Sequence, residues 1–319
     1  MRVLVTGGAG FIGSNLVDYL SRLPDVSVAV LDDFSASTPE LLEGFAVDII
    51  RGDVRDTVDV NRALEGVDGV IHLAAHTRVI ASVEEPETDF SINVEGTFRL
   101  LRAVAEHGIQ RFVFASTGGA ILGEVTPPVH ENMPPRPVSP YGAAKLAGEG
   151  YCSAFAGSYG MRTVSLRFSN VYGPRSHRKG SVIAHFLKQI LRRRALSVFG
   201  DGSQTRDFVY VEDLCAVIWR AFKVAPKGSC FQLGSGVGTS VNALIGLIRK
   251  TVGPGYPFEV EYLPFRQGEI KHTYSDISRA RDHLQFVPST SLETGLAETW
   301  RWLAAHSQGS EDRETARPQ

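Results

Sequence analysis

The sequence predicts an α/β fold in which helices cover both faces of a doubly wound parallel sheet. In the first half of the chain, short apolar runs alternate with longer amphipathic segments, which is the pattern of right-handed crossovers between parallel strands. The apolar runs are dense in Val, Ile, Leu and Phe, as expected for strands buried on both faces. The first run also ends in a glycine-rich turn that opens a helix-like segment. The 319 residues can bury one large core or two smaller ones.

The strands are expected where the apolar runs occur. These runs are Val3 to Val5, Val26 to Leu31, Asp48 to Arg51, Val70 to Leu73, Phe112 to Ala115 and Val164 to Arg167. Between them, helical periodicity predicts amphipathic helices over Phe11 to Leu23, Ile92 to His107 and Tyr141 to Tyr159.

The glycine-rich turn follows the first predicted strand. Gly7 permits the sharp turn, Gly10 lets the backbone approach a pyrophosphate, and Gly13 lets the helix pack against the strand. The helix beginning at Phe11 and Ile12 offers free N–H groups and the positive end of its dipole to phosphates. Because the turn lies in a β-α-β unit, we interpret it as a Rossmann-type dinucleotide site rather than a tight turn alone.

The second predicted strand ends at Asp32, which lies 19 residues beyond Gly13. A carboxylate near this offset accepts hydrogen bonds from the adenosine ribose hydroxyls and repels the 2′-phosphate of NADP. No arginine follows at the adjacent positions, which are Asp33, Phe34 and Ser35. The sequence therefore predicts NAD as the cofactor.

Tyr141 and Lys145 stand near the start of a predicted helix, and their spacing of four places them on one face of it. A phenol with its ordinary pKa of about 10 is a poor base, but a nearby ammonium and the positive nicotinamide ring both favour the phenolate. We interpret Tyr141 as the candidate general base. Ser116 and Thr117 follow a strand at its carboxyl end, where open α/β sheets bind ligands and a hydroxyl can bind a substrate hydroxyl.

Further motifs follow one another along nearly the whole chain. They are Thr6 to Gly13, Asp32, Gly52-Asp53-Val54, His72 to Ala75, Asn93, Ser116-Thr117, Tyr141/Lys145, Leu166 to Pro174, Gly200 to Gly202, Gln204 to Phe208 and Arg266 to Glu269. Together they resemble the extended short-chain dehydrogenase/reductase superfamily and its NAD-dependent epimerase/dehydratase family. Within that family the chain is most similar to the UDP-glucose (UDP-galactose) 4-epimerases.

The resemblance implies roles for individual residues. Around NAD it places Asp53 and Val54 at the adenine, Ala74 and Ala75 along the channel, Lys145 at the nicotinamide ribose, and Leu73, Thr77, Asn93 and Phe168 nearby. Around a UDP-sugar it places Thr117 at the reacting hydroxyl and Tyr141 as the base. It places Arg206 and Arg266 at the diphosphate, Phe199 at the uracil and Glu269 at the uridine ribose. The other residues expected along the pocket are Thr77, Asn170, Ser181, Val182 and Thr273. Paired guanidinium groups suit a diphosphate because each offers several donors in a fixed fork.

The resemblance also implies an organisation of the chain. Residues 1–172 are expected to form the NAD-binding domain, with a later segment near 208–236 returning to it. Residues 173–305 are expected to form the mainly nucleotide-sugar-binding part, and 306–319 a flexible tail. By analogy we expect a homodimer formed through the helices over Ile92 to His107 and Tyr141 to Tyr159.

The residues after Thr117 favour epimerisation over related reactions. The relatives all form a 4-keto sugar, and a 4,6-dehydratase then uses an Asp-Glu pair where this chain has Gly118 and Gly119. Decarboxylases similarly carry Glu near this place. Without a second acid, the ketone is expected to accept the hydride on its other face. Two departures from the epimerase pattern are Leu122 in place of Tyr and a glycine stretch one residue longer.

Substrate choice stays open between several sugars. The small Thr273 suggests room for an N-acetyl group, and the basic segment Gly173 to Lys179 suggests a uronate, although Asn170 stands where uronate epimerases carry Thr. The alternatives to epimerisation of a UDP-hexose are a UDP-uronate epimerase, a decarboxylase, a net dehydrogenase or a non-catalytic NAD sensor.

Composition excludes other function classes. The 33 Lys and Arg nearly balance the 35 Asp and Glu, which argues against a nucleic-acid partner, and no apolar stretch approaches the ~20 residues of a membrane helix. Three cysteines without paired spacing indicate a reducing, cytoplasmic location.

His72 and His76 lie at a predicted strand end without a third ligand, so no metal is expected.

Overall fold

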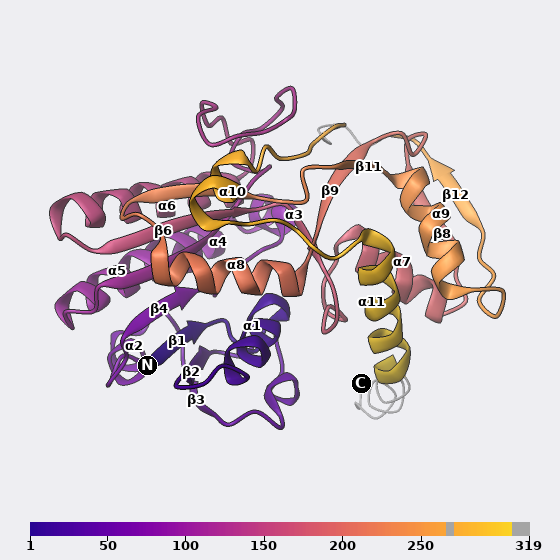
Figure 1. The fold of residues 1–319 in the computed structure, drawn as a ribbon. Coiled ribbons are helices and arrows are strands. Elements are labelled where there is room, and N and C mark those ends of the chain that lie inside the picture. Colours follow the sequence, from indigo (N-terminus) through magenta and orange to yellow (C-terminus); the bar gives the residue numbers. More distant parts are fainter. Residues whose placement is uncertain (266–270, 308–319) are drawn as a thin grey trace.

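The computed structural model describes residues 1–265 and 271–307. Its centre is a parallel sheet with the strand order β10-β6-β5-β4-β1-β2-β3, which confirms the Rossmann-type fold (Figure 1). The strands are β1 (Arg2–Thr6), β2 (Ser27–Asp32), β3 (Val47–Arg51), β4 (Gly69–His72), β5 (Arg111–Thr117), β6 (Arg162–Phe168) and β10 (Ser229–Leu233).

Helices cover both faces of this sheet because alternate strand residues point to opposite sides. Val3 and Val5 face a core shared with α1 and α8, whereas Leu4 faces a second core shared with α2, α5 and α6. The bounds are α1 (Phe11–Ser21), α2 (Thr57–Ala63), α5 (Thr97–Glu106), α6 (Pro140–Ser158) and α8 (Val211–Val224). Short elements complete this half: η1 (Pro39–Leu42), α3 (Val79–Glu84), α4 (Pro86–Phe90) and a π-helical turn, η2 (Ser91–Gly96).

The C-terminal part has its own core between small sheets and helices. One sheet has the order β11-β9-β7 and another pairs β12 with β8. The elements are β7 (Asn170–Tyr172), α7 (Val182–Leu191), β8 (Leu196–Phe199), β9 (Thr205–Tyr210), β11 (Gly238–Ser240), α9 (Val241–Val252), β12 (Val260–Leu263), α10 (Ser278–Leu284) and α11 (Leu292–Ser307). Buried residues of α7, α9 and α11 meet in this core, apart from the main sheet.

The chain crosses between the two parts more than once. After β7 it enters the C-terminal part, and then α8 and β10 return, so that β10 pairs in parallel with β6 at the edge of the main sheet. Helix α11 continues through Ser307, past position 306 where the sequence placed the start of a tail. There the His306 ring stacks on Trp302 at 4.1 Å between centroids, which supports the last turn. No helix in the described ranges is long and apolar enough to cross a membrane.

Candidate active site

The glycine-rich turn between β1 and α1 packs too tightly for side chains. Gly7 adopts φ +69°, and a Cβ there would lie 2.7 Å from the backbone N of Ala74. A Cβ on Gly13 would collide with the Gly7 carbonyl oxygen. The same oxygen accepts a hydrogen bond from Gly10 N at 3.1 Å. The turn therefore lies directly against the segment that follows β4, and the first N–H groups of α1 face outward from it.

Asp32, at the end of β2, connects the glycine turn to the next loop. Its Oδ2 accepts from Ala9 N at 2.9 Å, and its Oδ1 accepts from Phe34 N at 2.9 Å and from Ser37 Oγ at 2.7 Å. The residue is 7% exposed. Beside it, Asp33 Oδ1 accepts from Ser35 N and Oγ, which closes a local turn. The predicted ribose-binding carboxylate thus also fixes the loops on either side.

The residues predicted to surround the adenine lie beyond β3. Arg55 donates hydrogen bonds to both carboxylate oxygens of Asp53 and lowers the pKa of that carboxyl group. Val54 is buried against the core under α5. Leu73, Ala74 and Ala75 directly follow β4 and remain partly exposed, while Thr77 is exposed. The structure therefore brings these predicted cofactor residues to the carboxyl edge of the sheet.

Helix α6 begins at Pro140 because the flanking residues favour a helix start there. Ser139 Oγ accepts a hydrogen bond from Gly142 N at 3.2 Å, and Pro140 occupies the first turn. Gly142 is needed because a Cβ would collide with the Ala120 carbonyl oxygen. This start places Tyr141 and Lys145 on the sheet side of the helix, with Lys145 Nζ 5.9 Å from the centroid of the Tyr141 ring.

Burial controls the ionisation of this pair. It lowers the pKa of Lys145 to about 8, against the opposing effect of Asp89. It also raises the pKa of Tyr141 above its usual value, and the negative charge of Asp89 adds to this. In the chain alone, desolvation by burial therefore opposes ionisation of the phenol. The expectation that the ammonium and the nicotinamide ring together favour the phenolate concerns the cofactor-bound site and stays a prediction.

A buried acidic residue that the sequence did not single out lies beside the pair. Asp89 is fully buried at the end of α4, and its Oδ1 accepts from Asn93 Nδ2 at 2.8 Å. Asn93 also bonds the backbone N and O of His76, at 2.9 and 2.8 Å. All of these Asn93 contacts are internal, so it positions the segment after β4. Its place in the π-helical turn η2 aims it there, a common use of such turns.

Ser116 differs from its predicted substrate-facing role. Its Oγ donates to Glu149 Oε1 at 2.6 Å, and the residue is 4% exposed. Glu149 also forms a two-pronged ion pair with Arg167, with contacts of 2.8 and 2.7 Å. This buried cluster joins β5, β6 and α6 behind the predicted site. Glu149 lies four residues after Lys145 on the same helix face, which is the signal that sequence analysis missed.

Thr117 and Asn170 border the substrate side. Thr117 ends β5 and Asn170 begins β7, and both are partly exposed. Between them, Phe168 at the end of β6 is buried. A Cβ on Gly118 would meet Nε2 at the end of the Gln232 side chain, which would have to move to admit it. Leu122, the departure from the epimerase pattern, is buried in a small apolar cluster with Ile121 and therefore serves packing.

The remaining predicted substrate residues come from the C-terminal part. Ser181 and Val182 start α7, Phe199 ends β8 and Arg206 lies in β9, where its Nη1 donates to the carbonyls of Thr205 and Lys271. Thr273 N donates to Thr205 O at 3.3 Å, beside Arg206. Arg266 and Glu269 lie outside the described residues. Asp207, which sequence analysis missed, is buried and accepts from Ser235 and Ser275, so it holds β9 to the neighbouring loops.

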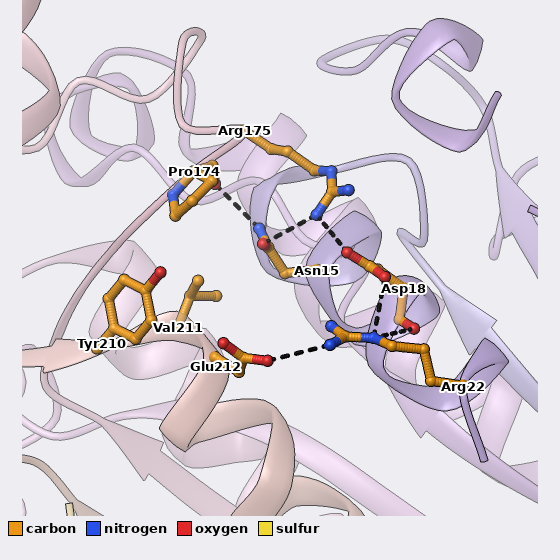
Figure 2. A pocket seen from close by; sticks show the side chains of 8 residues that line it. All are labelled: Asn15, Asp18, Arg22, Pro174, Arg175, Tyr210, Val211 and Glu212. Carbon is orange, nitrogen blue, oxygen red and sulfur yellow. Dashed lines mark hydrogen bonds and ion pairs between the residues drawn. The ribbon is translucent and has the colours of Figure 1, made fainter. Parts of the chain in front are cut away.

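A polar cavity of about 100 Å³ lies away from these residues (Figure 2). It is a packing seam between α1, the turn after β7 and the start of α8. Arg175 bonds Asn15 and Asp18 across it, and Arg22 pairs with Glu212. A second cavity of about 350 Å³ lies between Glu124 to Pro127 and the Lys271-His272 segment, on the substrate side.

The two histidines near β4 serve the fold. His72 is buried between Thr6 Oγ1 and Thr97 Oγ1, at 2.7 and 3.0 Å, and burial lowers its pKa to about 3, so it is neutral. His76 Nδ1 lies 3.7 Å from Asp89. Among the described residues, no group of three His, Cys, Asp or Glu side chains is arranged to hold a metal ion.

The residues at this edge fit a dinucleotide. The glycine turn leaves the α1 amides uncovered, and Lys145 is 3% exposed with no hydrogen-bond acceptor in the described part of the chain. A buried ammonium without an acceptor is costly, and ligand hydroxyls remove that cost. Gly7, Gly10, Phe11 and Ile12 would hold the pyrophosphate, Asp32 the adenosine ribose and Lys145 the second ribose.

Comparison with known proteins agrees with this geometry. The family model "NAD dependent epimerase/dehydratase family" matches residues 3–234. The chain is 39% identical to a UDP-glucose 4-epimerase of Mycolicibacterium smegmatis, covering 97% of this chain and 100% of that protein.

Solved structures agree as well. A Thermotoga maritima UDP-glucose 4-epimerase with UDP-glucose has TM-score 0.90 and 36% identity, covering 99% of this chain and 100% of the other. A Bacillus cereus UDP-glucuronic acid 4-epimerase, in complex with UDP-glucuronic acid and NAD, has TM-score 0.88 and 32% identity, covering 96% and 99%. The chain therefore belongs to the NAD-dependent epimerase/dehydratase family and is an NAD-dependent nucleotide-sugar epimerase of the short-chain dehydrogenase/reductase type.

Proposed function

We propose that the enzyme interconverts UDP-glucose and UDP-galactose, which are C4 epimers of one UDP-hexose. The observation that carries this proposal is the arrangement at the end of β5: the hydroxyl of Thr117 lies at the strand end, the Tyr141-Lys145 pair lies on α6, and Gly118 and Gly119 bring no acidic side chain to the strand end. One base without a second acid suits a reaction that removes and returns the same two groups.

In the proposed reaction, Thr117 binds the C4 hydroxyl of the sugar and Tyr141, as phenolate, takes its proton. Bound NAD supplies the oxidising power by accepting hydride from C4 and giving it back. The product of the first half is a 4-keto sugar, which turns within the site to present its other face. Tyr141 then returns the proton to the oxygen. The proton and the hydride are each removed once and returned once, so no net NADH forms.

The charges around Tyr141 explain why the base becomes active only in the complex. Burial keeps the phenol protonated in the chain alone by raising its pKa, and the negative charge of Asp89 adds to this effect. NAD would bring a positively charged nicotinamide ring to this site, and that charge would favour the phenolate. Lys145, whose protonated form Asp89 already favours, would hold the nicotinamide ribose.

A sugar panel tests the proposal. The purified enzyme is incubated with UDP-glucose, UDP-galactose, UDP-N-acetylglucosamine and UDP-glucuronic acid, and products are followed by NMR together with absorbance at the NADH band. We expect conversion of UDP-glucose to UDP-galactose with no accumulating NADH. Stoichiometric NADH would indicate a net dehydrogenase, and the absence of product from every sugar would indicate a sensor. Turnover of UDP-glucuronic acid alone would replace the hexose with a uronate.

The placement of the basic segment supports a hexose over a uronate. Arg175 donates a hydrogen bond to Asn15 and forms an ion pair with Asp18, both on α1. Arg178 Nη1 donates to the Ser37 carbonyl at 3.3 Å. These contacts direct the segment toward the loops that flank the predicted NAD site. Both guanidinium groups are therefore engaged by protein groups rather than left for a sugar carboxylate.

A homodimer is proposed for the assembly, formed through the helices of residues 92–107 and α6 as the sequence predicts, with α3 and α4, which pack against α6, extending the interface. Large apolar side chains are exposed on this face: Val79, Ile80, Val83, Phe90 and Tyr151. Contiguous exposed apolar side chains favour association. We expect light scattering after size exclusion to give twice the chain mass, and Phe90→Asp, at a position that is 55% exposed, to give the single mass without loss of fold by circular dichroism. A monomeric wild-type protein would contradict this assembly.

A further inference from the structure

A basic segment, Gly173 to Ser181, crosses from the C-terminal part to the dinucleotide side. Arg175 contacts α1, and Arg178 reaches the carbonyl of Ser37, whose hydroxyl bonds the Asp32 carboxylate. Lys188 Nζ of α7 donates to the carbonyls of His177 and Lys179, both at 2.9 Å, and fixes the segment from its other side. The segment is thus held over the start of α1 by contacts at several points.

Lys179 is the one side chain of this segment that points inward without a counter-ion among the described residues. Its Nζ donates to the Val171 carbonyl at 3.3 Å and lies 4.8 Å from the centroid of the Phe11 ring. No described carboxylate forms an ion pair with it. The surrounding protein desolvates the ammonium and lowers its pKa to about 8.

A half-buried ammonium whose described contacts are one long carbonyl hydrogen bond and the face of the Phe11 ring is stabilised further by an anion. The Lys179 ammonium faces Phe11, which is the first residue of α1. The free backbone amides at the start of this helix therefore lie next to the ammonium. Those amides and the positive end of the helix dipole attract the same kind of ligand. Two independent features, an unpaired cation and a helix start, therefore meet at one place.

We propose that Lys179 binds the diphosphate of the dinucleotide, closing the basic segment over the glycine turn. The diphosphate of the sugar nucleotide has the same chemistry, but the Phe11 contact places the ammonium on the cofactor side. An epimerase must keep its reduced cofactor until the hydride returns, and a charged contact from the substrate part strengthens that retention. Lys179 is a binding residue in this account and takes no part in proton transfer.

The test measures nucleotide binding rather than turnover. Wild type, Lys179→Met and Lys179→Arg are stripped of nucleotide and titrated calorimetrically with ADP-ribose, adenosine and UDP. Loss of a charge-assisted contact is expected to weaken ADP-ribose binding by about 10- to 100-fold in Lys179→Met. Adenosine and UDP affinities should change by less than about threefold, and Lys179→Arg should restore most of the ADP-ribose affinity.

A matched control removes a charge elsewhere in the C-terminal part. Arg192→Met removes an exposed guanidinium at the C-terminal end of α7, so ADP-ribose affinity should fall by less than about threefold. Circular dichroism and the UDP titration establish that each variant is folded. Unchanged ADP-ribose affinity in Lys179→Met would overturn the proposal, and a selective loss of UDP affinity would assign the lysine to the sugar nucleotide instead. Equal losses of ADP-ribose affinity in both Met variants would show that the effect comes from the net charge of the protein and not from a contact made by Lys179.

Discussion

Replacing Tyr141 with Phe is expected to lower kcat by about 100- to 10,000-fold, the range typical for removing a general base. The ring that packs under the start of α6 is kept, so only the proton acceptor is lost. Binding of UDP, measured by calorimetry, should change by less than about threefold. Steady-state turnover of UDP-glucose gives the first quantity and the titration gives the second.

Tyr159→Phe is the matched control for this change. Tyr159 caps the C-terminal end of the same helix, is 63% exposed and stacks on Phe155, away from the strand ends. Loss of this exposed hydroxyl should leave kcat within about twofold of the wild-type value, since substitutions at the surface and away from the active site have small effects. Equal losses of turnover and of UDP affinity in Tyr141→Phe would contradict the role of base.

Lys145→Met should stabilise the ligand-free protein while disabling it. The folded-state pKa of Lys145 is about 8 against 10.5 for the free side chain, so the folded state binds the proton more weakly than the unfolded state. The resulting cost is fully present below pH 8 and disappears as the pH rises toward 10.5. At neutral pH, removing it should raise the free energy of unfolding by about 1–3 kcal/mol, with Asp89 offsetting part of the gain.

The same substitution should lower kcat by at least about 100-fold, because the cofactor loses its ribose contact and the site loses its positive charge. Urea unfolding of nucleotide-free protein at pH 7 and pH 10, together with turnover assays, measures both effects. The stability difference between variant and wild type should narrow at the higher pH. A variant that is less stable than wild type at both values would show that the lysine is not destabilising in the ligand-free fold.

Local sequence patterns were sufficient to predict the central sheet and the site residues that lie at its strand-to-helix turns. The glycine turn, Asp32 and the Tyr141-Lys145 pair each depend on a spacing within one element or one β-α-β unit. Strand centres were also predicted, but strand ends were not, since β5 and β6 extend to Arg111 and Arg162, which pair with each other. Ladder pairing extends a strand beyond its apolar run, and no local pattern reports it.

The supporting residues could not be predicted because they act across long sequence separations. Asp207 holds Ser235 and Ser275, and Glu149 joins Ser116 to Arg167, each through contacts that only folding creates. The effect of burial on Tyr141, which raises the pKa of the phenol in the chain alone, was also not predictable from the sequence. A spacing of four reveals that a lysine is near, but the cost of burial depends on everything packed around the phenol.

The basic segment shows a further limit of composition. Its charges suggested a carboxylate on the sugar, yet Arg175 and Arg178 bind protein groups near the cofactor loops, and Lys179 faces Phe11. Charge density in a sequence indicates that an anion is near, but the direction in which each side chain points decides which anion it is.

The central claim is that one base removes a proton while C4 hydride leaves the sugar and returns to its other face. Turnover of UDP-glucose carrying deuterium at C4, followed by proton and deuterium NMR in ordinary water, tests it most directly. We predict UDP-galactose with the deuterium retained at C4 and no label in the solvent. Label in the water, or a product inverted at C4 without its deuterium, would contradict the account.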